Sequence, residues 1–174
     1  MNPQTATAAL RVVNHISAMV AYWDADQKCV FSNDAYRSWF GISPDEMVGM
    51  SMEKLLGPLY QKNLPYVQAV LAGKKQVFER QIALPNGEIK ESIATYTPDI
   101  ADGKVVGFSA HVADVTRLHQ REAALADMIQ EAIAVLEKTK RSFRSKELGA
   151  LRERFVQMSQ RLDVERASGA PTEG

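Results

Sequence analysis

Chemically reactive side chains are few and widely spaced in this sequence. The single cysteine, Cys29, lies in a β-rich segment, and the three histidines, His15, His111 and His119, are far apart along the chain. A zinc site usually takes four ligands, often in pairs at short spacing. No such pairing occurs here, and Cys29 fits better as a small buried apolar side chain. The sequence therefore predicts no metal site.

The acidic residues do not form a catalytic pattern either. Asp24 and Asp26 lie in a predicted turn, and Asp45 and Glu46 lie in the first turn of a predicted short helix. Carboxylates are favoured at both places by local hydrogen bonding and by the helix dipole. The chain also lacks a phosphate-binding P-loop, GxSxG, HExxH and a dinucleotide-binding fingerprint. We therefore expect a protein that is not an enzyme.

The composition is that of a packed, soluble protein. Hydrophobic residues make up 45% of the chain and charged residues 24%. Basic and acidic residues number 21 each, so the net charge gives no indication of nucleic-acid binding. No apolar run is long enough to cross a bilayer, and the first residues lack the pattern of a secretory signal. We expect a cytoplasmic protein without a membrane partner.

Strong turn signals divide the first two-thirds of the chain. A helix is predicted within residues 1–16, followed by a β-hairpin over 19–31, several short helices and a longer helix over 63–75. Asn-Gly at 86–87 and Asp-Gly at 102–103 then separate three further strands. Two early and three late strands with helices between them predict an α+β fold. It has one antiparallel sheet with helices on one face.

Capping residues indicate where the short helices begin and end. Asn33 or Asp34 is expected to cap the first of them, which Gly41 would end. Ser43 is expected to cap the next. Pro65 is expected near the start of the longer helix, where a missing N–H costs little.

The order of these elements, and the residues that carry it, resemble the PAS family of sensory modules. The resemblance covers about residues 8–118 and is carried by VFSNDAYRSWFGISPDEMVGMSMEKLLG, LPYVQAVLAGKKQVFERQIALPNGEIK, YTPDIADGKVVGF and the closing DVT. It implies a five-stranded antiparallel sheet that encloses a small cavity with the short helices. It also implies a homodimer that signals through a C-terminal helix to a separate effector. Together with the loss of proline and most glycine after Thr116, the resemblance predicts a stand-alone bacterial sensory protein. Its expected parts are an N-terminal helix (1–16), a PAS domain (17–116), a helical extension (117–166) and a disordered tail (167–174).

The resemblance also bears on the cofactor, which stays unknown. Flavin-binding light sensors of the family carry a reactive cysteine on a helix, but SMEKLLGPLY has none, and this disfavours a covalent flavin adduct. The helix that often carries an axial haem histidine has no histidine, and CxxCH of c-type haem is absent. A small apolar or aromatic ligand, a non-covalent haem or flavin, and a ligand-free interaction scaffold all remain open.

Aromatic side chains are the main candidates for lining the cavity that the resemblance implies. Ordinary core packing would also require most of them. His111 is added because its strand could direct it inward, although a surface or satisfied histidine is the simpler interpretation. The candidates are Tyr22, Phe31, Trp39, Phe40, Tyr66, Phe78, Tyr96, Phe108 and His111.

The last third of the chain predicts helix with a heptad pattern that would bury a stripe against a partner. The dimer seam predicted from it comprises Leu125, Ile129, Leu136, Phe143, Leu151, Phe155 and Met158. Its two halves are out of register around KTKRSFRSK, which indicates either one helix with a shifted face or a helical hairpin. The five cations in that window fit a solvated helix face better than a nucleic-acid site.

Only Asp114-Val115-Thr116 separates the last predicted strand from this helix, so the sequence predicts no loop between them. In the family an Asp-x-Thr signature lies at this joint, and Asp114 and Thr116 match it. Both side chains can accept hydrogen bonds from free N–H groups at a helix start. We expect this pair to relay the signal, with simple helix capping as the alternative.

Overall fold

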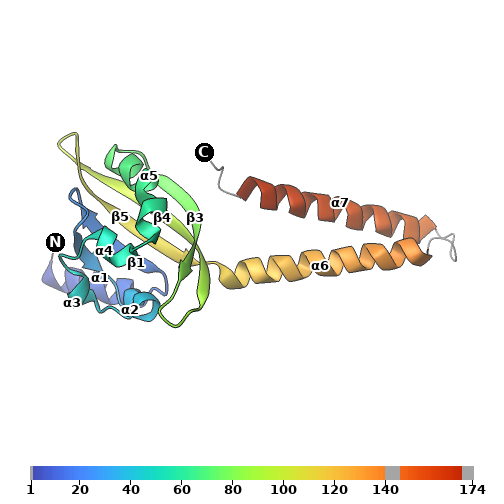
Figure 1. The fold of residues 1–174 in the computed structure, drawn as a ribbon, viewed down its shortest axis with the longest axis horizontal. Coiled ribbons are helices and arrows are strands. Elements are labelled where there is room, and N and C mark those ends of the chain that lie inside the picture. The colour runs from blue at the N-terminus through green and yellow to red at the C-terminus, as the bar shows by residue number, and fades with distance from the viewer. Residues whose placement is uncertain (1, 140–145, 170–174) are drawn as a thin grey trace. The chain divides into compact units, whose positions relative to one another are not determined.

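The computed structural model describes residues 2–139 and 146–169 (Figure 1). The chain divides into two compact units, Met1–Val115 and Thr116–Gly174. Among the described residues, no helix combines the length and the apolar character that crossing a membrane requires.

The first unit is built on a five-stranded antiparallel sheet, as the sequence predicts. Its strands are β1 (Met19–Asp24), β2 (Cys29–Ser32), β3 (Gln76–Ala83), β4 (Ile89–Ala101) and β5 (Lys104–Asp114). The strand order is β2-β1-β5-β4-β3. The pairing of β5 with β1 joins the early hairpin to the late three-stranded meander. This long-range pairing gives the domain one continuous sheet.

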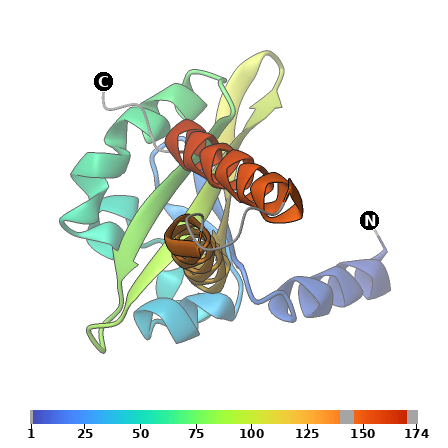
Figure 2. The same cartoon turned by 90° about the vertical axis from the view of Figure 1, so that its right-hand side faces the viewer.

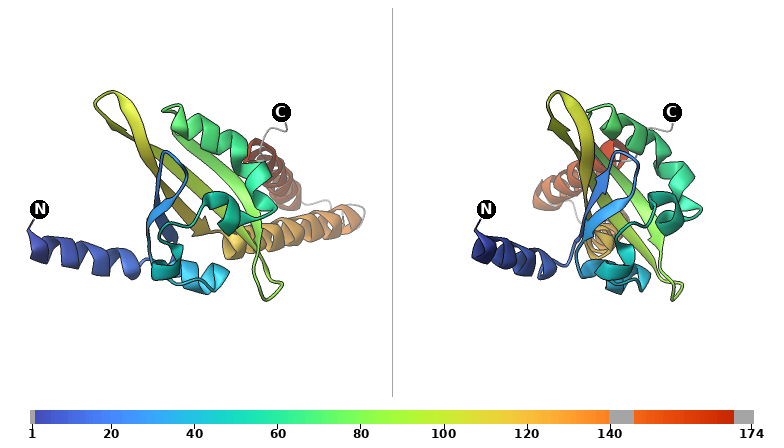
Figure 3. Two further views of the ribbon diagram at one scale, coloured as in Figure 1. Left: turned by 60° about the vertical axis from the view of Figure 1, so that its left-hand side comes forward. Right: turned by 90° about the vertical axis from the view of Figure 1, so that its left-hand side faces the viewer.

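Short helices and one longer helix pack on one face of the sheet. They are α2 (Ala35–Phe40), α3 (Pro44–Met47), α4 (Met52–Leu56) and α5 (Leu59–Leu71). Helices α2, α3 and α5 contact the strands, and α4 contacts α5 (Figure 3). The helix α1 (Pro3–Asn14) buries none of its residues in this unit (Figure 2). The fold is therefore α+β with its core between the sheet and α2–α5.

Side chains alternate between the two faces of the strands, and this decides what enters the core. On β1, Met19, Ala21 and Trp23 are buried. On β5, Phe108 and Val112 are buried with Ala110 between them. Burial of each large apolar side chain contributes about 1.5–3 kcal/mol to stability. The inner face of the sheet is thus the main source of the core.

The predicted turns at 86–87 and 102–103 are present. Gly87 has φ 85°, while Asp102 and Gly103 have φ 51° and 74°. Two successive positive φ values are the geometry of the two-residue turn that Asp-Gly favours. The capping box predicted by Ser43 is also present, since its hydroxyl accepts from the N–H of Glu46 and the Glu46 carboxylate accepts from the N–H of Ser43.

Asn33 does not cap α2. The N-cap residue is Asp34, and its side chain makes no capping hydrogen bond. The fully buried Asn33 amide points back toward the end of α1 and the start of β1. Its Nδ2 donates to the backbone carbonyl oxygens of Val13, Ile16 and Ala18. Its Oδ1 accepts from the N–H of Val20 at 3.0 Å, so this one side chain binds four backbone groups between α1 and β1.

Pro65 lies inside α5, not near its start. The helix begins at Leu59, which places Pro65 in its middle. Proline cannot donate to the carbonyl of Gln61 four residues earlier. Gln61 is exposed, so water can hydrate that carbonyl, and the helix continues through the proline.

The second unit is a helical hairpin. Helices α6 (Thr116–Thr139) and α7 (Lys146–Gly169) contact each other (Figure 1). Gln130 Nε2 lies 2.6 Å from Ser159 Oγ, and Arg152 Nε lies 3.2 Å from Glu137 Oε1. From one contact to the other, the residue number rises by seven on α6 and falls by seven on α7. The two helices are therefore antiparallel, and both contacts belong to the same register. Of the two alternatives left open by the sequence, the structure has the hairpin, and α7 reaches three residues beyond the predicted end at 166.

Candidate functional site

A small cavity lies between the inner face of the sheet and helices α2 and α4. Its free volume is about 10 Å³, which is about enough for one water molecule. The residues that line it are Met19, Trp23, Tyr36, Phe40, Met52, Leu55, Leu56, Arg80, Tyr96, Ala110 and Val112. Most of these side chains are apolar or aromatic, and one is charged.

Arg80 is the charged residue of the cavity. It lies on β3 between Phe78 and Ile82, which are both buried, so the strand alternation turns it toward the core. Its Nη1 lies 3.3 Å from the hydroxyl of Tyr96, and its guanidinium carbon lies 5.6 Å from the centre of the Phe78 ring. No carboxylate of the described residues forms a salt bridge with it.

Two buried N–H groups at the cavity have no hydrogen-bond partner among the described residues. They are Nε1 of Trp23 and Nε of Arg80. Both groups can only donate. An unpaired buried donor costs about 1–3 kcal/mol, and more when it is charged. The cavity therefore presents two donors and no acceptor matched to them.

Tyr36 of α2 also lines the cavity. Burial raises the pKa of Tyr36 far above its ordinary value; the nearby Tyr96 also raises it, whereas Arg80 lowers it. Tyr36 is therefore neutral at every physiological pH and keeps its phenolic proton.

Two of the predicted cavity residues, Phe40 and Tyr96, line the cavity. Trp39, Phe78 and Phe108 are buried in the core around it. The Phe78 and Phe108 rings contact Tyr96 at centroid distances of 5.2 and 5.3 Å. Phe78 and Phe108 therefore support the position of Tyr96, and none of the three residues lines the cavity.

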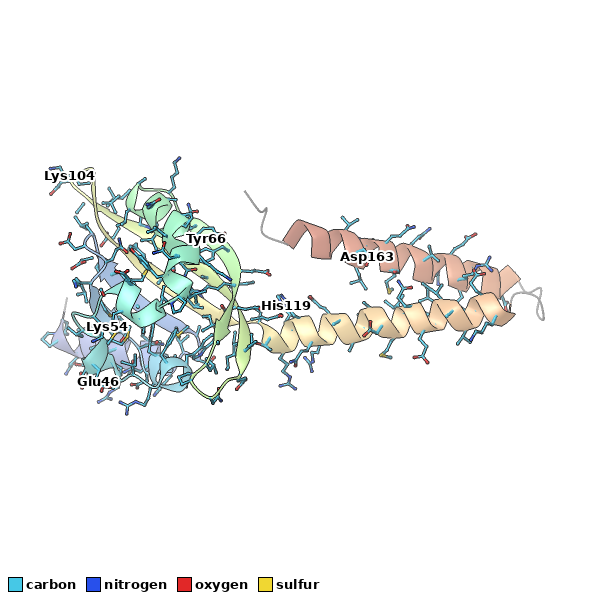
Figure 4. The ribbon with its side chains drawn as sticks, viewed as in Figure 1. Glu46, Lys54, Tyr66, Lys104, His119 and Asp163 are labelled. Atoms are coloured by element: carbon cyan, nitrogen blue, oxygen red, sulfur yellow. The ribbon has the colours of Figure 1, made fainter. Side chains whose placement is uncertain are left out.

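The other four candidates lie elsewhere. Tyr22 and His111 occupy the strand positions opposite to the buried ones, so they project from the other face of the sheet, and His111 is exposed. Phe31 is half-buried on β2. Tyr66 on α5 stacks on Phe78 with 3.7 Å between ring centres (Figure 4). A one-residue step along a strand exchanges the two faces, and this places Tyr22 and His111 on the face away from the cavity.

Trp23, Tyr36 and Arg80 were missed by reasoning from the sequence. Trp23 follows Met19 and Ala21 at strand spacing, and this alternation would have placed it in the core. The same alternation would have placed Arg80 between Phe78 and Ile82. No pattern in the sequence marked Tyr36, because its short helix is oriented by tertiary contacts.

Cys29 is buried on β2, in agreement with its interpretation as a small core residue. Its Sγ donates to the carbonyl oxygen of Phe31 at 3.4 Å. Burial raises the pKa of the Cys29 thiol to about 11. The reactive thiolate is therefore a minor species at neutral pH. Among the described residues, no three His, Cys, Asp or Glu side chains gather to hold a metal ion.

The joint after β5 is fastened to β4. β5 ends at Asp114 and α6 begins at Thr116. Lys90 Nζ lies 2.7 Å from Asp114 Oδ2 and 4.9 Å from the centre of the Trp39 ring. The N–H of Val115 donates to the carbonyl of Glu91 at 2.9 Å. The last residues before α6 therefore belong to the sheet.

Only some residues of the predicted dimer seam are buried inside the helical hairpin. Ile129 is buried between α6 and α7, and Leu136 and Phe155 are half-buried. Phe143 lies outside the described residues. Leu125, Leu151 and Met158 are 48%, 40% and 47% exposed. The hairpin thus uses part of the seam internally and leaves the rest exposed.

One side of the hairpin carries a shallow apolar groove. The residues that line it come from both helices: Met128, Glu131, Ala132, Val135, Leu136, Leu151 and Phe155. Leu125 and Met158 extend the same side, because each lies one helical turn or less from a lining residue. We call this side, formed by Leu125, Met128, Val135, Leu151 and Met158, the exposed hairpin face.

Comparison with known proteins identifies the family to which this sheet and its helices belong. A family model described as the PAS fold matches residues 13–120. The protein belongs to the PAS family. Members of this family are generally sensory modules, and the matches indicate no catalytic family. No curated protein matches the chain.

Several solved structures share the PAS fold at low sequence identity. The PAS domain of a Colwellia psychrerythraea protein is 16% identical, with a TM-score of 0.55 over 65% of this chain and 98% of its own. The Rhodobacter sphaeroides LOV protein is 15% identical, with a TM-score of 0.56 over 98% of this chain and 100% of its own. VqmA of Vibrio cholerae, in a complex with ligand and DNA, is 17% identical, with a TM-score of 0.54; the match covers 63% of this chain and half of VqmA.

Proposed function

We propose that this PAS protein is a sensory module that forms a homodimer and relays a signal from its domain through α6 to a separate effector. The observation that carries the proposal is the joint between β5 and α6. Val115 alone separates the strand from the helix, and hydrogen bonds to β4 hold both Asp114 and Val115. A change in the sheet would therefore reach α6 without a loop to absorb it.

The cavity is lined by the same two strands, β4 and β5, that lead to the joint. Tyr96 of β4 and Val112 of β5 line the cavity, and both strands continue to the joint. A ligand that altered their pairing would act on the residues that precede α6. Allosteric relay requires such an element, whose position differs between two states.

Dimerisation is supported by the exposed hairpin face. A two-helix hairpin cannot bury apolar side chains on its outer side, and this face holds five of them. A second copy is the occupant that fits best, because pairing two hairpins produces a four-helix bundle with matched apolar faces. Helix α1, with Leu10 50% and Val12 63% exposed, offers a second apolar surface for the same dimer. VqmA, a structural neighbour, is described as a dimer.

Native mass spectrometry of the full chain tests this function, because it reports oligomer and bound ligand together. We expect the mass of a dimer at micromolar concentration. A monomer with unfolded residues 117–166 would contradict the proposal.

A ligand-free interaction scaffold is the second candidate, and the small free volume of the cavity favours it. Non-covalent haem or flavin would need a far larger space than one water molecule occupies. A visible absorption spectrum of freshly purified protein distinguishes these cases, because either cofactor would colour the sample.

A further inference from the structure

We propose that the PAS cavity binds a small planar carboxylate, held by the indole Nε1 of Trp23 and the guanidinium Nε of Arg80. The inference rests on the proposed sensory function, in which this cavity is the input site. It identifies the chemical class of the ligand and the residues that select it.

The first step is the hydrogen-bonding character of the cavity. Trp23 is 1% exposed, and its Nε1 has no partner among the described residues. The Nε of Arg80 is buried in the same way, and both residues line the cavity. Because indole and guanidinium N–H groups cannot accept, the matching ligand atoms must be acceptors. Two oxygens on one carbon supply two acceptors in one plane.

The second step is charge. Arg80 keeps its positive charge at any physiological pH. Its contacts within the described residues are the Tyr96 hydroxyl at 3.3 Å and the Phe78 ring at 5.6 Å, and neither carries a compensating negative charge. Lys90 and Arg152, which each form a salt bridge, lie outside the cavity. An anionic ligand would supply the missing charge through a charge-assisted hydrogen bond.

The third step is shape. The cavity walls include the flat rings of Tyr36, Phe40 and Tyr96, which favour a planar ligand. The free volume of about 10 Å³ admits only one water molecule, so a larger ligand must displace side chains. Met19 and Met52 line the cavity, and methionine side chains repack easily around a guest. Phosphate is a poorer match because it is tetrahedral and has no apolar surface, whereas most of the cavity walls are apolar or aromatic.

Benzoate is a suitable probe, with benzamide as its neutral counterpart of almost the same shape. The indole N–H signal of Trp23 in a proton–nitrogen NMR spectrum of the full chain reports binding directly. Trp39, the only other tryptophan, does not line the cavity and serves as the internal control. We expect benzoate to shift the Trp23 signal in a saturable way and benzamide to bind at least about tenfold more weakly, because it lacks the charge that pairs with Arg80.

Arg80→Met is the matched variant, because it keeps an unbranched apolar chain and removes the charge. It should weaken benzoate binding by about tenfold or more and leave benzamide unchanged. If this variant does not fold, the comparison of benzoate with benzamide in the unaltered protein still decides the question. Equal affinity for the two probes would overturn the proposal. So would an unchanged Trp23 signal at millimolar benzoate, which would mean that the cavity holds an internal water only.

The dimer mass, measured on the same samples, separates this inference from the proposed function. A dimer that ignores benzoate would contradict the carboxylate site and leave the sensory relay standing. A monomer that binds benzoate through Trp23 and Arg80 would support the site and contradict the relay between paired hairpins.

Discussion

At the scale of single residues, Asn33 illustrates how one side chain can organise a connection. Its amide fills the hydrogen-bonding needs of three carbonyl groups and one N–H group between α1 and β1. Hydrophobic contacts could not replace it, because apolar side chains offer these backbone groups neither a donor nor an acceptor. We therefore regard Asn33 as the residue that fastens α1 to the PAS domain.

Asn33→Ala should lower the free energy of unfolding by at least about 2 kcal/mol, because it leaves several backbone groups without partners. Urea unfolding measures this change. Asp34→Ala is the matched control, since the Asp34 side chain makes no capping hydrogen bond, and it should change stability by less than about 0.5 kcal/mol. Equal stability of the two variants would show that the Asn33 amide is dispensable.

Cys29 makes stability depend on pH in the alkaline range. Its thiol keeps its proton in the folded protein up to about pH 11, whereas the ordinary pKa is 9.0. The contribution of Cys29 is thus complete below pH 9 and falls as the pH rises toward 11, because only the unfolded chain gains the thiolate form.

The free energy of unfolding of the native protein and of Cys29→Ala, compared between pH 8 and 10.5, measures this contribution. Over that range the free energy of unfolding of the native protein should fall by about 1–2 kcal/mol more than that of the variant. Iodoacetamide at pH 8 should also label unfolded protein much faster than folded protein. Parallel pH profiles together with fast labelling of the folded state would disprove the burial argument.

At the scale of elements, the joint between β5 and α6 is the feature with the clearest mechanical role. Lys90 pairs with Asp114 and also lies over the Trp39 ring, so α2, β4 and β5 meet where α6 is about to begin. The pair is partly exposed, and such ion pairs contribute only about 0–1 kcal/mol. Its importance is therefore expected in the position of the helix more than in overall stability.

Asp114→Ala should leave the PAS domain folded and loosen the first turns of α6. Hydrogen exchange measures this as faster exchange of residues 116–124, with unchanged exchange in β1 and β5 upstream of the joint. Asp99→Ala is the control, because Asp99 also accepts a side-chain hydrogen bond on the sheet, from Tyr22 at 2.8 Å, but lies far from the joint along β4. Unchanged helicity and dimer affinity in Asp114→Ala would refute a relay role.

At the scale of the whole molecule, the hairpin decides which apolar residues remain for a partner. Ile129 is 4% exposed because α7 covers it, whereas Leu125, one turn earlier on α6, is 48% exposed. Substitutions at these two positions should therefore have different effects, although both belong to the same predicted heptad seam.

Leu125→Glu should weaken the dimer by at least about tenfold, since each chain would bring a charge into an apolar interface, and leave helicity unchanged. Sedimentation or light scattering over a concentration series measures the dissociation constant. Gln120→Glu adds the same charge at an exposed position on another side of α6 and should have little effect. Ile129→Ala should instead reduce helicity, because it opens the hairpin itself. Equal dimer affinity of Leu125→Glu and Gln120→Glu would rule out the exposed hairpin face as the interface.

Much of the fold could be predicted from local patterns. Asp102-Gly103 and Asn86-Gly87 predicted tight turns because only certain residues adopt positive φ at low cost. Alternating apolar residues predicted the strands, and Ser43 predicted a helix start through its capping box. These features depend on neighbours within a few residues, and a sequence displays such neighbours directly.

The candidate site was predicted only in part, since Phe40 and Tyr96 reach the cavity and Tyr22 and His111 do not. The residue type was a poor guide because aromatic side chains occur on both faces of the sheet. Strand alternation was the better guide, and it would have pointed to Trp23 and Arg80.

The sequence by itself determined the elements, their turns and the PAS family, because each follows from local chemistry or from a resemblance spread along the chain. Only the tertiary structure decided what Gly107 is for: the Tyr22 ring crosses it, and a β-carbon there would lie 2.4 Å from the backbone oxygen of Trp23. It likewise decided that α6 and α7 form a hairpin and that Arg80 meets Trp23 at one cavity. These outcomes depend on contacts between residues that are distant in sequence, and such contacts exist only once the chain has folded.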